Sequence, residues 1–278
     1  QISAIGLHGQ TIWHSPDTLY PFSMQLGDGA LVAKRVQIDV VNDFRSGDVA
    51  NGGQGAPLTP AFHQAIFEKK YDDKSTAVLN LGGIANITIL TESFIGYDVG
   101  VANILSDYWI LKKQNLPFDK DGSWARQGVV NNELLKLLLS DPYFKQLPPK
   151  STGREYFNAT WLENKLELFP TISAVDVQAT LLEFTILPIV EAVQDKKIKR
   201  LIVCGGGALN GYLLEKLSQT LDSIEVIKSD DVGIDSIFLE AIAFAWLAYK
   251  RVNDQHINLQ TITGSSRPSI LGAIHAKD

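Results

Sequence analysis

Three glycine-rich turns, at residues 81–86, 97–100 and 204–210, most constrain what this chain can fold into, because each follows an apolar strand-like run. Glycine allows positive φ and lets the backbone approach a ligand without a Cβ in the way. A helix that begins after such a turn directs free N–H groups at an anion, typically a phosphate. Any one of the turns can be an ordinary tight turn. Together they favour a nucleotide cleft built from the ends of strands.

The pattern of apolar residues predicts which segments are strands and which are helices. Strands are expected at residues 2–7, 36–41, 77–81, 86–90, 94–99, 200–204 and 224–228. Helices are expected at residues 61–71, 103–114, 123–139, 154–168, 176–194, 209–221 and 236–251. A long glycine-rich loop is expected at residues 46–57. Strands that alternate with helices predict an α/β class with mixed sheets flanked by helices.

Length and composition exclude several classes of protein. The 278 residues predict about two domains or lobes, and the polar stretch 69–74 is the candidate hinge. A net charge of −6 without a basic run gives no reason to expect a nucleic-acid partner. Apolar runs such as 241–248 fall far short of the ~18 to 20 residues that a membrane span needs. The single Cys204 cannot form an internal disulfide, which favours a reducing cytoplasm.

The common sequence fingerprints of nucleotide, metal and hydrolase sites do not fit. Gly205 and Gly207 match G-x-G-x-x-G, but Asn210 takes the place of the third glycine, and Lys150 lacks the glycine that precedes a P-loop lysine. The histidines have no zinc-ligand spacing, so no metal-ligating residue is predicted. G-x-S-x-G is absent, so Ser-His-Asp catalysis has no support.

Two acidic residues are candidates for a functional role. Asp98 stands at a strand end before Gly100, where it can act as a general base or merely hydrogen-bond the following turn. Glu240 falls on a helical face with the apolar residues 237, 244 and 247. An unpaired buried charge is expensive, so this carboxylate is expected either to be functional or to form a structural salt bridge.

Two further polar residues lie in or beside the glycine-rich loop. The guanidinium fork of Arg45 suits a carboxylate or a phosphate, and pairing with Asp43 or Asp48 is the alternative. Gln54 stands among Gly52, Gly53 and Gly55, so its amide can reach a ligand without obstruction. Both residues are therefore candidates for ligand binding.

Taken in order, the motifs resemble the 1,6-anhydro-N-acetylmuramic acid kinase family of the acetate and sugar kinase/Hsp70/actin superfamily. The resemblance spans essentially the whole chain, at residues 5–14, 25–28, 43–58, 80–88, 119–122, 149–155, 204–210, 240–248 and 263–264. It implies a two-lobed ribonuclease-H-like (actin-like ATPase) fold with ATP between the lobes. It also implies an enzyme that opens the 1,6-anhydro bond of the sugar with water and phosphorylates O6, giving N-acetylmuramic acid 6-phosphate and ADP in cell-wall recycling.

The resemblance also implies roles for particular residues. Asp98 takes the place of the catalytic base, and the substrate-binding residues are expected to be Arg45, Gln54, Glu240 and His8. The nucleotide-binding residues are expected to be Gly82, Gly83, Asn86, Gly205, Gly206, Gly207 and Asn210. ATP and Mg²⁺ are the implied cofactors. The anhydro-amino sugar is the implied partner in a cytoplasmic enzyme, and a homodimer is allowed for.

The chain departs from the family pattern in two places. The D-T-G-P-G-N motif is D-V-G-V-A-N here, at residues 98–103, and the N-terminal phosphate loop G-x-M-S-G-T-S-x-D-G is absent. We therefore expect residues 1–73 to be the remainder of an incomplete N-terminal lobe and residues 74–278 to be the C-terminal lobe with the nucleotide-binding turns. The alternatives are a non-catalytic sugar-binding or regulatory relative and an inactive truncated fragment. Unpaired edges at residues 2–5 and 36–41 predict self-association.

Overall fold

The computed structural model describes residues 2–16, 18–71, 74–92, 94–194 and 196–278. The strands are β1 (Ala4–Gly6), β2 (Gln10–Ser15), β3 (Phe22–Leu26), β4 (Asp39–Asn42), β5 (Thr76–Leu81), β6 (Ile84–Leu90), β7 (Ile95–Val101), β8 (Arg200–Cys204), β9 (Glu225–Lys228) and β10 (Ala273–His275). The α-helices are α1 (Gly29–Val36), α2 (Ser46–Ala50), α3 (Thr59–Lys70), α4 (Asn103–Gln114), α5 (Asn132–Leu139), α6 (Ala159–Leu166), α7 (Ala174–Val193), α8 (Gly211–Thr220), α9 (Leu239–Val252) and α10 (Gln260–Thr263). Short 3₁₀ helices are η1 (Lys120–Gly122), η2 (Ala125–Gln127), η3 (Pro142–Lys145), η4 (Gly206–Leu209) and η5 (Ser229–Val232).

A five-stranded sheet in the order β7-β6-β5-β8-β9 carries most of the structure. β5, β8 and β9 are parallel, whereas β6 is antiparallel to both β5 and β7. This order, with its second strand reversed, is the ribonuclease-H-like order. The predicted α/β class with mixed sheets flanked by helices is confirmed.

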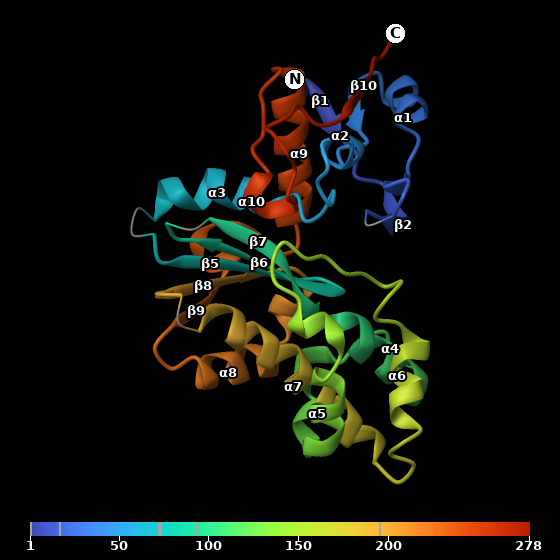
Figure 1. The fold of residues 1–278 in the computed structure, drawn as a ribbon, viewed down its shortest axis with the longest axis vertical. Coiled ribbons are helices and arrows are strands. Elements are labelled where there is room, and N and C mark those ends of the chain that lie inside the picture. Colours follow the sequence, from blue (N-terminus) through green and yellow to red (C-terminus); the bar gives the residue numbers. More distant parts are fainter. Residues whose placement is uncertain (1, 17, 72–73, 93, 195) are drawn as a thin grey trace.

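Helices cover both faces of this sheet (Figure 1). Leu79 and Ile87 pack with α7 and α8 on one face, and Val78 and Ile202 pack with α3 and α9 on the other. A strand buried on both faces reads as a continuous apolar run rather than as an alternation. The sequence of β5 has this character, and the strand predicted at residues 77–81 is confirmed.

A second sheet, in the order β1-β4-β10, combines strands from distant parts of the chain. β4 pairs in parallel with β1 and antiparallel with β10, so the predicted unpaired edge at residues 36–41 is wrong. α9 packs across β1 so closely that a Cβ on Gly6 would lie 2.2 Å from the carbonyl oxygen of Phe244. The C-terminal elements α9 and β10 therefore lie against β1 and β4 of residues 1–73. Residues 72 and 73 of the candidate hinge lie outside the described residues.

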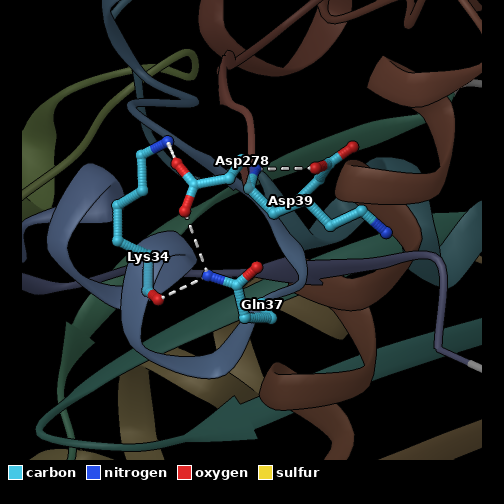
Figure 2. A network of polar contacts seen from close by, with 5 residues as sticks. Lys34, Gln37, Asp39 and Asp278 are labelled. Atoms are coloured by element: carbon cyan, nitrogen blue, oxygen red, sulfur yellow. Dashed lines mark hydrogen bonds and ion pairs between the residues drawn. The ribbon is translucent and has the colours of Figure 1, made fainter.

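The C-terminal tail is tied to α1 and to β4 (Figure 2). The Asp278 carboxylate forms an ion pair with Lys34, and the side-chain amide of Gln37 donates to it at 3.4 Å. The Lys277 amide donates to the Asp39 carboxylate at 2.9 Å. These contacts fix β10 as the third strand of its sheet.

Several element boundaries differ from the sequence prediction. Asp28 caps α1 by accepting from the Leu31 amide at 2.8 Å, so residues 29–36 are helical and the next strand begins at Asp39. Residues 46–50 form α2 inside the predicted loop, and the hairpin of β2 and β3 was not predicted. Asn131 caps α5 through the Leu134 amide. The predicted helix at 123–139 therefore begins only at residue 132.

None of the helices that the structure describes has both the length and the apolar character required to cross a membrane.

Candidate active site

Two cavities meet at the first turn of α4. A charged cavity of about 540 Å³ lies between the two sheets, and its lining includes His8, Arg45, Asn86, Asp98 and Glu240. A second cavity of about 520 Å³ lies against α4, α7 and α8, and its lining includes Gly206 and Gly207. Asn103 lines the second cavity and the next residue, Ile104, lines the first.

His8 and Arg45 are brought together by the parallel pairing of β1 and β4. Parallel strands end at the same edge of a sheet, and both residues follow such an end. The Arg45 guanidinium donates to the Gly55 carbonyl at 2.7 Å and to His8 Nε2 at 2.9 Å. A guanidinium can only donate, so Nε2 is the acceptor and the imidazole is neutral. Burial and the nearby Arg45 charge accordingly lower the pKa of His8 to about 4.

Asp98 is buried within β7 and faces the charged cavity. Its carboxylate accepts from the Thr152 amide at 3.0 Å, and its backbone carbonyl accepts from the Tyr143 hydroxyl at 2.5 Å. Burial raises the pKa of Asp98 to about 7, although the Thr152 amide and the Arg45 charge oppose the shift. A carboxyl group with a pKa near neutrality is suited to general-base chemistry.

Glu240 lies in the first turn of α9 and lines the charged cavity, but it is exposed. The prediction of a buried carboxylate on an apolar stripe is wrong, because Ile237 on that stripe is also exposed while Phe244 and Leu247 are buried. At this end of the helix Leu239 packs in the core, whereas Glu240 faces the cavity and solvent. The exposed carboxylate needs no salt bridge to be tolerated at this position.

Gln54 and Asn86 have surroundings that their sequence context did not predict. The Gln54 side-chain oxygen accepts from the Ser151 hydroxyl at 3.0 Å instead of lining the charged cavity. Asn86 lies beside Asp98 on the neighbouring strand, in the charged cavity rather than in the glycine-lined one. Its nucleotide-binding role stays a prediction.

Several buried polar atoms of residues in the charged cavity have no hydrogen-bond partner among the described residues. They include Arg45 Nε, Asn86 Oδ1 and Thr152 Oγ1. Buried polar atoms are almost always hydrogen-bonded in folded proteins. A donor, an acceptor and a hydroxyl in one cavity suit a ligand that carries both hydroxyl and carbonyl groups.

The turn at Gly82 and Gly83 is held against the start of α4. The Asn103 and Ile104 amides donate to the Gly82 and Gly83 carbonyls at 3.1 and 3.2 Å, and the Asn103 side-chain amide donates to Gly82 at 2.7 Å. Positions 82 and 83 have no atom closer than 3.6 Å to where a Cβ would stand. The backbone of this turn is therefore fixed and open to a ligand.

In the turn at residues 205–207, Gly205 has a positive φ in a crowded position, whereas Gly206 has open space beside it. Gly205 has φ +80°, and a Cβ there would lie 2.4 Å from Asn80 Oδ1. No atom lies within 4 Å of a Cβ built on Gly206, which lines the second cavity. Asn210 also lines this cavity, but its side-chain oxygen caps α8 by accepting from the Leu213 amide at 3.1 Å.

Substitution by alanine is expected to have different effects at these two glycines. Gly205→Ala is expected to lower Tm by about 3–8 °C, because it forces a side chain into backbone and an unfavourable φ. Gly206→Ala is expected to leave Tm unchanged within about 1 °C while weakening the predicted binding of a nucleotide, because its methyl group enters the cavity. Thermal unfolding and nucleotide titration of both variants measure these effects. Equal losses of Tm would contradict the difference in packing between the two positions.

Several residues that line the cavities were not singled out from the sequence. In the charged cavity they include Thr11, Trp13, Thr152, Arg154 and Glu155. In the second cavity they include Asn103, Asp107, Asp119 and Gln178. Residues 5–14, 119–122 and 149–155 carried the family resemblance, and that signal could have identified the lining residues that lie in these motifs.

A ribonuclease-H-like sheet with a glycine-lined cavity beside a charged one fits the actin-like ATPase fold, a class of proteins that includes the sugar kinases. Residues 1–277 match the family model described as anhydro-N-acetylmuramic acid kinase. The enzyme of that name from Sulfurimonas denitrificans is 49% identical over 282 residues, which cover 99% of this chain and 76% of the relative. The chain belongs to the anhydro-N-acetylmuramic acid kinase family. The predicted family and the prediction of a sugar kinase are confirmed.

Another relative is similar in sequence to the same degree, whereas a matching solved structure is only distantly similar. The anhydro-N-acetylmuramic acid kinase of Pasteurella multocida is 49% identical over 100% of this chain and 74% of the relative. Among solved structures, the activator of the 2-hydroxyisocaproyl-CoA dehydratase from Clostridium difficile with bound ADPNP has a TM-score of 0.41 and 12% identity. That match covers 77% of this chain and 68% of the activator.

Proposed function

We propose that this protein uses ATP and water to convert anhydro-N-acetylmuramic acid to N-acetylmuramic acid 6-phosphate and ADP. The observation that carries the proposal is the convergence of Asp98, Arg45 and several unpartnered polar atoms in one cavity beside a glycine-lined cavity. Membership of the family supports the same substrate. The charged cavity takes the sugar, and the glycine-lined cavity takes the nucleotide.

Asp98 acts as the general base in this reaction. It takes a proton from water, whose oxygen bonds to C1 of the sugar while the bond from C1 to O6 breaks. The released O6 attacks the γ-phosphorus of ATP, and the bond from that phosphorus to the ADP oxygen breaks. The phosphate accepts the leaving sugar oxygen, so no protein acid is required at O6. Arg45 and Glu240 bind the sugar.

The nucleotide enters as its Mg²⁺ complex. No group of three or more His, Cys, Asp or Glu side chains converges on a metal position within the described part of the chain. Mg²⁺ is commonly held through substrate phosphates with few protein ligands, so it is carried by ATP in this proposal. It supplies charge neutralisation at the phosphate oxygens. Gly206 and Gly207 present backbone to the nucleotide in the glycine-lined cavity, whereas Gly83 lines the charged cavity, where the γ-phosphate must reach the sugar.

Isotope labelling tests the proposed reaction. Full-length protein incubated with MgATP and the anhydro sugar in H₂¹⁸O is expected to place ¹⁸O at C1 of the product and none in its phosphate, as measured by mass spectrometry of the fragmented product. ATP without sugar is the control for background hydrolysis. ¹⁸O that appears in inorganic phosphate, with the sugar unchanged, would show simple ATP hydrolysis and contradict the proposal.

The biological setting follows from the substrate. An anhydro-amino sugar of this kind is a fragment of cell wall, so the reaction serves cell-wall recycling. ATP and the buried thiol of Cys204 are both compatible with a cytoplasmic enzyme. A homodimer stays a prediction, which the mass of the purified protein in solution would test.

A further inference from the structure

Gln54 forms a hydrogen bond that links the glycine-rich loop to the segment at residues 149–155. Its side-chain oxygen accepts from the Ser151 hydroxyl at 3.0 Å, across 97 positions of the sequence. Its backbone amide donates to the Thr263 carbonyl at 2.9 Å. The residue is thus anchored through its backbone and directed at Ser151 through its side chain.

The segment that carries Gln54 is held rigidly by a buried carboxylate. Asp48 is fully buried and accepts from the Gly55 amide at 2.7 Å and from the Thr263 hydroxyl at 2.8 Å. A Cβ at Gly53 would lie 2.3 Å from the Asp48 carboxylate, so only glycine allows this close packing. The glycines on both sides of Gln54 therefore fix the position from which its side chain reaches Ser151.

The residues on both sides of Ser151 contact Asp98. The Thr152 amide donates to the Asp98 carboxylate at 3.0 Å, and the Asp98 amide donates to the Lys150 carbonyl at 3.2 Å. Ser151 lies between these two contacts. Whatever holds Ser151 in place also holds the amide that faces the carboxylate.

We propose that Gln54 is a positioning residue, which acts through Ser151 to keep the Thr152 amide on the Asp98 carboxylate. This replaces a direct role for Gln54 in binding the sugar, and it rests on the proposed function of Asp98 as the base. The link joins the glycine-rich loop beside β4 to the segment beside β7. Asp98 is therefore oriented by residues on both sides of the charged cavity.

The electrostatics around Asp98 show what loss of the link would change. The titratable groups that face this carboxyl are Arg45, Lys150, Glu155 and Tyr143. Burial raises the pKa of Asp98, whereas the hydrogen bond from Thr152 favours the ionised form and lowers it. A loosened Thr152 amide therefore raises the pKa further. The base is then protonated up to a higher pH, and the acidic limb of kcat/KM moves upward.

The test compares Gln54→Ala, Ser151→Ala and the double variant in full-length protein. Each single variant is expected to lower kcat about five- to tenfold, the effect of one lost hydrogen bond. The double variant is expected to be no worse than either single one, because both remove the same link. KM for the sugar should stay within about twofold. The acidic limb of kcat/KM, near pH 7 in the wild type, should move up by about half a pH unit or more.

Two controls and a measurement without turnover separate the possible outcomes. Ser151→Thr keeps the hydroxyl and should retain kcat, and Gln219→Ala truncates an exposed amide on α8 and should change nothing. The pKa of Asp98, followed by ¹³C NMR of the carboxyl without sugar, should rise in Gln54→Ala. This readout remains valid even if the proposed reaction is wrong. An unchanged Asp98 pKa, or a loss confined to sugar affinity, would overturn the positioning role.

Discussion

Asp98→Asn is expected to lower kcat by about 10² to 10⁴-fold, the usual contribution of a general base. The amide keeps the size of the side chain and can still accept from Thr152, so the local structure should survive. In the proposed arrangement ATP occupies the other cavity, so the affinity for ATP should be retained. The measurements are steady-state kinetics with the anhydro sugar and a separate calorimetric titration with ATP.

A matched aspartate provides the control for this variant. Asp222→Asn removes an exposed carboxylate between α8 and β9 and should leave kcat unchanged. Turnover of Asp98→Asn at nearly the wild-type rate would show that Asp98 only stabilises its surroundings. The assignment of Asp98 as the general base would then have to be abandoned.

Arg45→Met is expected to lower kcat/KM by about 100-fold or more, mainly through weaker binding of the sugar. The guanidinium holds the Gly55 carbonyl and His8 on two sides, and its Nε is free for a ligand among the described residues. Loss of a buried, hydrogen-bonded charge typically costs about 2–5 kcal/mol. Removing this positive charge also raises the pKa of Asp98 further. Calorimetry with the sugar measures the first effect, and the pH profile measures the second.

Arg45→Lys tests whether geometry or charge is the important property. Lysine keeps the positive charge but cannot make both fixed contacts at once. We expect it to restore the pH profile while recovering only a small part of the affinity. Full recovery of affinity by lysine would contradict the role of the guanidinium fork.

The local sequence pattern predicted those strands and turns that depend only on a few consecutive residues. The apolar run of β5 and the glycine turns at residues 82 and 205 belong to this group, because periodicity and steric freedom are properties of a few consecutive residues. The position of Asp98 at a strand end is of the same kind. Its burial and its raised pKa depend on elements packed around it, and the pattern did not contain them.

Long-range contacts account for what the sequence pattern missed. Glu240 shares a helical face with the buried residues Phe244 and Leu247, yet it is exposed, because the elements that cover this face further along α9 do not cover Glu240. β10 is short and becomes a strand only because β4 offers an edge. The division of the chain at residues 73/74 stays a prediction, and the contacts of α9 and β10 with β1 and β4 cross it.

The sequence by itself determined the α/β class, the family and the identity of the charged residues, since these depend on residue type, order and spacing. Only the tertiary structure decided that Arg45 meets His8 and that Gln54 reaches Ser151. The physical reason is that a hydrogen bond needs its two atoms within about 3 Å. Residues that are 37 to 97 positions apart reach that distance only through the packing of sheets and helices between them.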